Sequence, residues 1–216
     1  MKKIQLALDL TDIDEAVSIA EACSHSVDIV EAGTYLCLSE GMKTSLPKLR
    51  TVFSGTILAD IRVARAGDKF ARLAFDYGAD IVTVVGEAPS SVIKSACDAA
   101  YDYGRQIAVE LFPGWSDDYV KLMVDLGVSN IVLQRTTKDE EENQTIVEEL
   151  HRLAQLVDGN VSVSLAGGIT PKTLALFESH PFDIAVVGSE IVKAVDPAAE
   201  ANRIRQLLLE YENDKI

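Results

Sequence analysis

The sequence predicts one (β/α)8 barrel that extends over residues 1–216 as a single domain. Eight short apolar segments alternate with eight longer segments of helical periodicity, at a spacing of roughly 25 residues. No linker or low-complexity tract interrupts this alternation. A doubly wound open sheet is the main alternative, and it is disfavoured because the chain lacks the GxGxxG fingerprint of that fold.

The apolar segments are short and rich in valine, isoleucine and leucine, as expected of strands that are buried on both faces of a parallel sheet. We expect strands at Ile4–Leu8, Val27–Val30, Thr56–Ala59, Asp80–Val85, Gln106–Leu111, Asn130–Leu133, Val161–Leu165 and Asp183–Val187.

The intervening segments carry apolar residues at helical spacing, beginning with a first helix whose apolar positions are Ile13, Ala16, Val17, Ala20 and Cys23. Prolines in the first turn and glycines just beyond the last turn support the later boundaries. These helices are expected at Glu40–Val52, Asp68–Tyr77, Pro89–Tyr103, Asp117–Leu126, Gln144–Val157, Pro171–Glu178 and Pro197–Tyr211.

The charge balance excludes several kinds of partner. The formal net charge is −14, which argues against nucleic acid and against anionic membrane surfaces because both bind basic patches. The N-terminus lacks the apolar core of a signal peptide, and no run approaches the ~20 apolar residues of a membrane span. The three cysteines form no CxxC pattern. These features favour a cytoplasmic protein with reduced thiols.

Four acidic residues stand at the expected carboxyl ends of strands: Asp9, Glu31, Asp60 and Glu110. In this fold those ends meet at one mouth, where catalytic groups lie. Two carboxylates at ~4 Å repel each other by about 4 kcal/mol at an effective dielectric constant of 20, so a cation or protonation must compensate. Oxygen ligands without histidine or cysteine point to Mg²⁺. Alternatively, individual acids pair with Arg62 or Arg65, or cap the next helix.

Two glycine-containing turns follow the last two expected strands and predict a phosphate site. They contain Gly167 and Gly168 in the first turn, and Gly188 with Ser189 in the second. Glycine allows backbone N–H groups to approach an anion, and barrel enzymes frequently bind phosphate after strands seven and eight. The histidines His25, His151 and His180 fall away from strand carboxyl ends, so histidine-based chemistry is not expected.

Together, the segments Leu6–Asp9, Val27–Thr34 and Ile57–Asp60 and the two glycine turns resemble the orotidine 5′-monophosphate decarboxylase superfamily. The nearest branches are 3-keto-L-gulonate-6-phosphate decarboxylase and 3-hexulose-6-phosphate synthase. Val109-Glu110-Leu111 with Trp115 is more similar to the decarboxylases, whereas the segment 188–197 is more similar to the synthases.

The resemblance implies a homodimeric carbon–carbon lyase that converts a keto sugar phosphate to a Mg²⁺-stabilised enediolate. Glu31 and Asp60 would hold Mg²⁺, Asp9 and Glu110 would line the substrate site, and the glycine turns would bind phosphate. The enediolate would form either by loss of CO₂ or by deprotonation before addition to formaldehyde.

The chain departs from the family pattern at the third strand. The family motif Asp-x-Lys-x-x-Asp reads here Asp60-Ile-Arg62-Val-Ala-Arg65. Arginine can stabilise an enediolate by charge, but it cannot donate a proton near neutrality. The family's histidine after strand six, its nearby arginine and its phosphate-binding arginine after strand eight are replaced by Gln134, Thr137 and Ser189.

These departures leave three hypotheses. The first is a Mg²⁺-dependent lyase of decarboxylase or aldolase type. The second is a changed reaction on a substrate whose additional carboxylate or phosphate meets Arg62 and Arg65. The third is a barrel that binds a sugar phosphate, or another protein, without catalysis.

Overall fold

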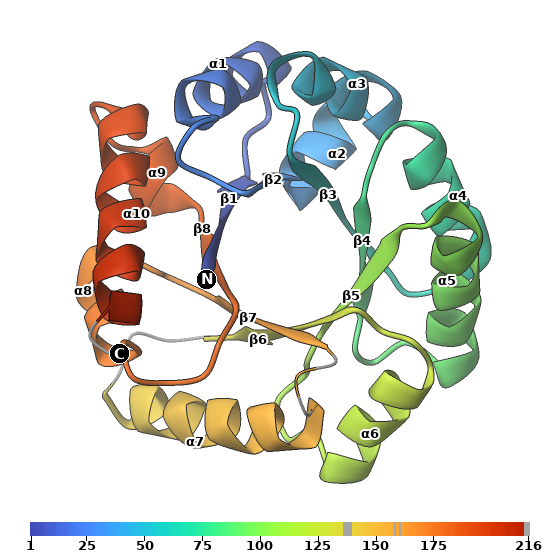
Figure 1. Ribbon diagram of the computed structural model, residues 1–216. Helices are drawn as coiled ribbons and strands as arrows, with labels where there is room; N and C mark the ends of the chain where they lie inside the picture. Colours follow the sequence, from blue (N-terminus) through green and yellow to red (C-terminus); the bar gives the residue numbers. More distant parts are fainter. Residues whose placement is uncertain (136–139, 158, 160, 214–216) are drawn as a thin grey trace.

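The computed structural model describes residues 1–135, 140–157, 159 and 161–213, and it confirms the barrel. Eight parallel strands pair in sequence order, and β1 pairs with β8 to close the sheet (Figure 1). The strands are β1 Lys3–Leu8, β2 Ile29–Ala32, β3 Thr56–Val63, β4 Ile81–Val85, β5 Gln106–Glu110, β6 Asn130–Gln134, β7 Ser162–Ala166 and β8 Ile184–Val187.

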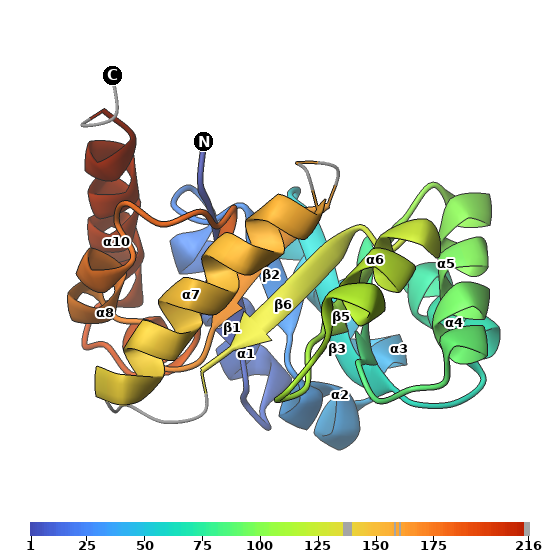
Figure 2. The same ribbon diagram turned by 90° about the horizontal axis from the view of Figure 1, so that it is seen from below.

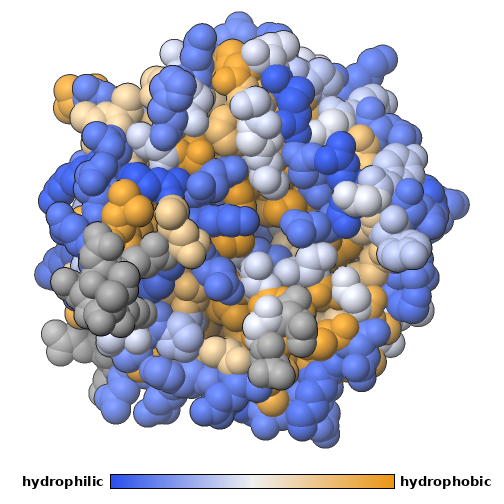
Figure 3. All heavy atoms as spheres, in the orientation of Figure 1, coloured by the Kyte–Doolittle hydropathy of each residue, from blue (hydrophilic) through white to orange (hydrophobic). Residues whose placement is uncertain are grey.

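Helices surround the sheet on the outside (Figure 1). They are α1 Ile13–Cys23, α2 Thr34–Glu40, α3 Met42–Val52, α4 Gly67–Asp76, α5 Ser90–Tyr103, α6 Asp117–Asp125, α7 Glu140–Val157, α8 Pro171–Leu176, α9 Ser189–Val192 and α10 Pro197–Asn213. Within the described ranges, no helix has the length and apolar character needed to cross a membrane. The outer ring that Figure 3 shows is largely hydrophilic, in keeping with the charged composition.

Two helical regions differ from the sequence expectation. The helix expected over Glu40–Val52 is instead the pair α2 and α3, separated at Gly41, whose φ is +75°. A left-handed residue cannot continue a right-handed helix, and glycine adopts it without a steric penalty. The short α9 was not expected at all, because four residues are too few to show a helical period.

The third strand is longer than predicted. The sequence placed its end at Ala59, but β3 continues to Val63 across a shift of register against β4. Arg62 lies in this irregular stretch with a φ of +45°. Bulges of this kind redirect side chains and often lie next to active sites. Asp60 is therefore inside the strand rather than at its end.

Side chains inside the barrel form layers of four that come from alternate strands, as the register requires. The lowest layer consists of Ile29, Ile81, Asn130 and Ile184, and the next of Gln5, Leu58, Ala108 and Ser164. Asn130 and Ser164 satisfy each other, with Nδ2 of Asn130 donating to Oγ of Ser164 at 2.9 Å. These layers close the barrel below the site, so the interior is a packed floor and not a channel.

At the amino ends of the strands, an aspartate stands directly before β2, β4 and β8: Asp28, Asp80 and Asp183. Each carboxylate accepts a hydrogen bond from a backbone N–H of the preceding strand. The donors are Ile4 at 2.8 Å, Ile57 at 2.8 Å and Val163 at 2.7 Å. This contact repeats with the alternation of the strands, and it fixes their register at the end opposite to α2 (Figure 2).

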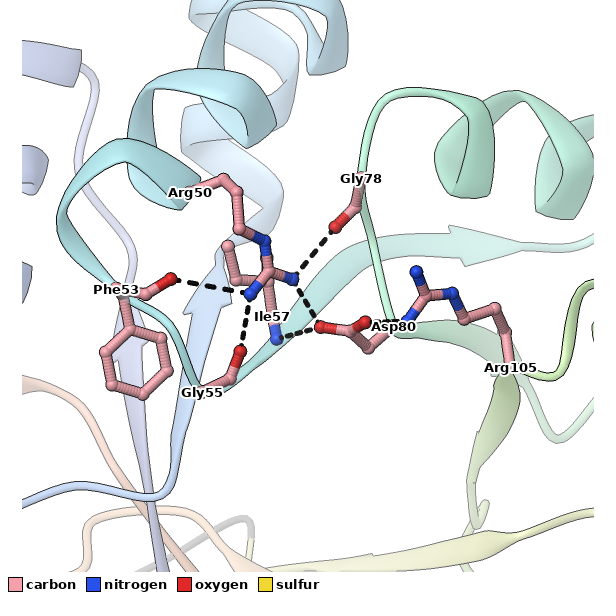
Figure 4. Close-up of polar contacts among 7 residues, drawn as sticks. All are labelled: Arg50, Phe53, Gly55, Ile57, Gly78, Asp80 and Arg105. Carbon is pink, nitrogen blue, oxygen red and sulfur yellow. Dashed lines mark hydrogen bonds and ion pairs between the residues drawn. The ribbon is translucent and has the colours of Figure 1, made fainter.

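Asp80 is the most heavily bonded of the three (Figure 4). Besides the N–H of Ile57, it pairs with the guanidinium groups of Arg50 and Arg105. Arg50 also donates to the carbonyl oxygens of Gly55 at 2.6 Å and Gly78 at 3.1 Å. One cluster thus ties the loops before β3 and β4 to the start of β5, and its position predicts a role in stability.

We expect Asp80→Ala to lower the free energy of unfolding by about 2–3 kcal/mol, because it leaves two guanidinium groups and a backbone N–H without their acceptor. Urea denaturation of the two proteins measures this change. Asp102→Ala is the matched control, since it breaks the more exposed Arg72–Asp102 pair and should cost less than about 1 kcal/mol. Equal losses in the two variants would contradict a special role for Asp80.

Candidate active site

A cavity of about 890 Å³ opens at the carboxyl ends of the strands, above the packed floor. Every strand contributes to its wall. Nine of the residues singled out from the sequence line it: Asp9, Glu31, Asp60, Arg62, Glu110, Gly167, Gly168, Gly188 and Ser189. Gln134 also lines it, and Thr137 lies outside the described residues. Arg65 is exposed after β3 and is not part of the wall.

Glu31 lies deepest among the acids, only 7% exposed. Its Oε2 accepts a hydrogen bond of 2.6 Å from the side-chain amide of Gln5 in β1. Burial and, after it, the neighbouring charge of Asp60 raise the pKa of Glu31 to about 8, although the Gln5 amide opposes this shift. A buried carboxyl with one neutral partner is held in a state that a proton or a cation would relieve.

Asp60 is oriented by two hydroxyl groups from neighbouring elements. Thr34, at the start of α2, donates to Oδ2 at 2.5 Å, and Thr83 in β4 donates to Oδ1 at 2.7 Å. The Thr83 hydroxyl in turn accepts the backbone N–H of Arg62 at 3.0 Å. The register shift in β3 makes this last bond possible, so the irregular strand and the orientation of Asp60 depend on each other.

Arg62 is the cation of the acidic side of the cavity. Its Nε lies 3.5 Å from Oδ2 of Asp60, and a terminal nitrogen lies 3.2 Å from Oε2 of Glu110. The pairing of acids with Arg62 that the sequence left open is therefore present for two of them, but not for Glu31. Burial raises the pKa of Glu110, and Arg62 partly offsets this effect.

Asp9 follows β1 at the rim of the cavity. Desolvation of its carboxyl raises its pKa, and the charge of Asp60 adds to the shift. The close contact of this rim with the start of α2 requires a glycine at position 33. A Cβ on Gly33 would lie 2.3 Å from Oδ1 of Asp9 and 2.7 Å from the carbonyl oxygen of Leu8. Thr34, which follows, is thereby held beside Asp60.

The glycine turn after β7 has a demanding backbone. Gly167 has a φ of +89° and Gly168 of +60°. A Cβ on Gly167 would lie 2.2 Å from the carbonyl oxygen of Arg135, whose guanidinium donates to the Gly167 carbonyl oxygen at 3.1 Å. The absence of side chains at 167 and 168 leaves the backbone open to the cavity, where it faces Gly188 and Ser189 across the β7–β8 side of the wall.

Sequence reasoning missed four polar residues of the wall: Gln5, Thr34, Thr83 and Lys193. Gln5 and Thr83 each interrupt an otherwise apolar strand at an inward position, which is a signal that the sequence contains. Thr34 and Lys193 follow strands at distances set by short helices, so no period marks them.

Comparison with known proteins now decides the family. The model of the orotidine 5′-phosphate decarboxylase/HUMPS family matches residues 2–204. The chain belongs to this family. It is 31% identical to 3-hexulose-6-phosphate synthase 2 of Staphylococcus saprophyticus over 207 residues, which cover 95% of this chain and 97% of the relative.

It is also 33% identical to the 3-keto-L-gulonate-6-phosphate decarboxylase SgbH of Escherichia coli over 199 residues, 92% of this chain and 90% of the relative. The crystal structure of KGPDC from Streptococcus mutans in complex with ribose 5-phosphate superposes with a TM-score of 0.87 at 27% identity, covering 97% of this chain and 98% of that one. The relatives thus divide between two named activities at similar identity.

The state of Glu31 predicts a particular pH dependence of stability when no divalent metal is present. The folded protein holds a proton on Glu31 between pH 4.5 and about 8, whereas the unfolded chain has lost it. The free energy of unfolding therefore falls as the pH rises through this window, by up to about 1.4 kcal/mol per unit. Urea denaturation at several pH values in a chelating buffer measures this slope.

Glu31→Gln should remove most of that slope and be the more stable protein at pH 8. Glu21→Gln, at an exposed position of α1, should keep the wild-type slope. A Glu31→Gln protein with an unchanged slope would show that Glu31 is ionised throughout.

Proposed function

We propose that this protein is a Mg²⁺-dependent carbon–carbon lyase that acts on a keto sugar phosphate through an enediolate, as a 3-keto-L-gulonate-6-phosphate decarboxylase does. The observation that carries the proposal is the division of one cavity into two parts. A buried carboxylate pair, Glu31 and Asp60, stands on one side, and a wall of open backbone at Gly167, Gly168 and Gly188 stands on the other. Family membership makes this division a basis for binding both ends of a phosphorylated sugar.

The donor set fits Mg²⁺. Glu31 has a single neutral partner, and each Asp60 oxygen accepts one hydroxyl proton, which leaves capacity for a further contact. In the described part of the chain no three His, Cys, Asp or Glu side chains converge on a common point, so the protein offers only part of a coordination shell. Mg²⁺ binds through one or two carboxylates and keeps several waters, which matches this pair. When bound, it polarises substrate oxygens and neutralises charge that develops on them.

The remaining groups have distinct tasks in this scheme. The Arg62 guanidinium, fixed between Asp60 and Glu110, stabilises negative charge near the reacting carbons but supplies no proton near neutrality. Asp9 and Glu110 have raised pKa values, which suits carboxyl groups that transfer protons. We assign proton transfer to these two groups and to water that reaches the open cavity.

A synthase-type aldol reaction is the second candidate. Its support is the 31% identity to 3-hexulose-6-phosphate synthase 2 and the synthase-like segment 188–197. Both reactions use an enediolate, so the same carboxylates and the same phosphate wall serve either one. The idea that Arg62 and Arg65 together meet an extra anionic group of the substrate gains no support, since Arg65 is exposed outside the wall and Arg62 is already paired.

We also infer a homodimer. Two apolar side chains of α2, Tyr35 and Leu38, are 62% and 78% exposed beside the cavity mouth. Phe70 and Leu73 of α4 are 44% and 40% exposed as well. A second copy of the chain would remove these surfaces from water, which is favourable in proportion to their apolar area.

Purified protein with Mg²⁺ and 3-keto-L-gulonate 6-phosphate should release CO₂. Asp60→Asn should lower kcat by roughly 100-fold or more, because it removes a charge that holds the metal and the enediolate. Asp14→Asn, which alters an exposed acid of α1, is the control and should retain activity. Release of CO₂ measured in a coupled assay, with and without a chelator, tests both expectations.

Consumption of formaldehyde with ribulose 5-phosphate, without CO₂ release from the keto-gulonate, would select the aldolase instead. If neither substrate reacts and neither raises the melting temperature with Mg²⁺, the lyase proposal fails, because a ligand at 100 times its Kd stabilises by about 2.7 kcal/mol.

A further inference from the structure

Two basic side chains line the described wall of the cavity, Arg62 and Lys193. They differ in what surrounds them. Arg62 is committed to Asp60 and Glu110, at 3.5 and 3.2 Å. Lys193 forms no ion pair with any residue in the part of the chain that the structure describes. It is thus a cation of the cavity whose charge is available to a ligand.

The ionisable groups of the wall are unevenly distributed. All of its acids come from the first five strands and the segments that follow them: Asp9, Glu15, Glu31, Asp60 and Glu110. From β6 onward the described lining residues are Val132, Gln134, Ala166, Gly167, Gly168, Ile169, Val186, Gly188, Ser189, Val192 and Lys193. Lys193 is the sole charged side chain of that second group, so the cavity has an acidic half and a half with one positive charge.

The local backbone directs Lys193 to this half. The carbonyl oxygen of Gly188 accepts the N–H groups of Ile191 and Val192, both at 3.0 Å, and the N–H of Lys193 donates to the carbonyl oxygen of Ser189 at 3.1 Å. One helical turn therefore separates Ser189 from Lys193. Residues four apart lie on the same face of such a turn, and both of these line the cavity. In Figure 1 this turn, α9, lies between β8 and α10.

We propose that Lys193 binds the phosphate group of the substrate, supplying the positive charge that the uncharged glycine turns lack. The inference rests on the proposed function for its substrate, a phosphorylated sugar. A phosphate monoester carries a charge of about −1.5 to −2 at pH 7 and would be repelled by the acidic half of the cavity. A lysine at the opposite half holds it as a point charge, while backbone N–H groups supply direction. Lys193 then orients the sugar with its reacting carbons toward Glu31 and Asp60.

The experiment measures the affinity for inorganic phosphate by calorimetry, with the full chain and no substrate present. Lys193→Gln should weaken phosphate binding by about 10- to 100-fold, the range expected for a hydrogen bond between charged groups. Lys193→Arg keeps the charge and should stay within about threefold of wild type. Lys172→Gln removes the same charge from α8, close to the glycine turn but outside the wall, and should change little.

Kinetics separate binding from chemistry. In an active enzyme, Lys193→Gln should raise KM for the sugar phosphate by the same factor and leave kcat nearly unchanged. Equal weakening in Lys193→Gln and Lys172→Gln, unaltered binding in Lys193→Gln, or no phosphate binding by the wild type would overturn the proposal. Phosphate binding that depends on Lys193 in a protein without lyase activity would support the phosphate site while rejecting the proposed reaction.

Discussion

The structure depends above all on one electrostatic constraint, the placement of Glu31 beside Asp60 inside a barrel whose lower layers are closed. Two carboxylates in such a place repel each other and lose their hydration. The surroundings meet this cost only in part: Gln5 contacts Glu31, while Thr34, Thr83 and Arg62 contact Asp60. The remaining imbalance is what makes the cavity suited to a cation, and it explains the pKa of about 8 at Glu31.

The irregular part of β3 is the structural means by which Asp60 and Arg62 are both brought to the cavity. They are separated by two positions in a strand whose register against β4 shifts between them and their neighbours. Arg62 adopts a left-handed backbone, which costs a non-glycine residue of order 1 kcal/mol or more. In return its N–H reaches Thr83, and Thr83 orients Asp60. A regular strand would break this chain of contacts.

The sequence was informative where a feature depends on local pattern. The apolar runs located all eight strands, and the acids that end or interrupt them located Asp9, Glu31, Asp60 and Glu110 in one cavity. Gly78, Gly104 and Gly127 have positive φ values, as helix-ending glycines should. What it did not reveal depends on contacts between distant segments.

The extension of β3 rests on Thr83 in the next strand, and the exposure of Arg65 follows from where that extension ends. The place of Lys193 depends on α9, which is too short to leave a periodic trace. The charge of the whole chain, −14, likewise gave no indication that one half of the cavity is free of acids.

The aspartates that precede β2, β4 and β8 have a consequence for the history of the molecule. Asp28, Asp80 and Asp183 anchor the strands at the end away from the site, and the arginines around Asp80 strengthen that anchor. Because this part of the framework does not rely on the residues of the mouth, substitutions there need not unfold the barrel. A lineage could thus exchange a lysine for Arg62 and an aspartate for Arg65 while selection acted on chemistry alone.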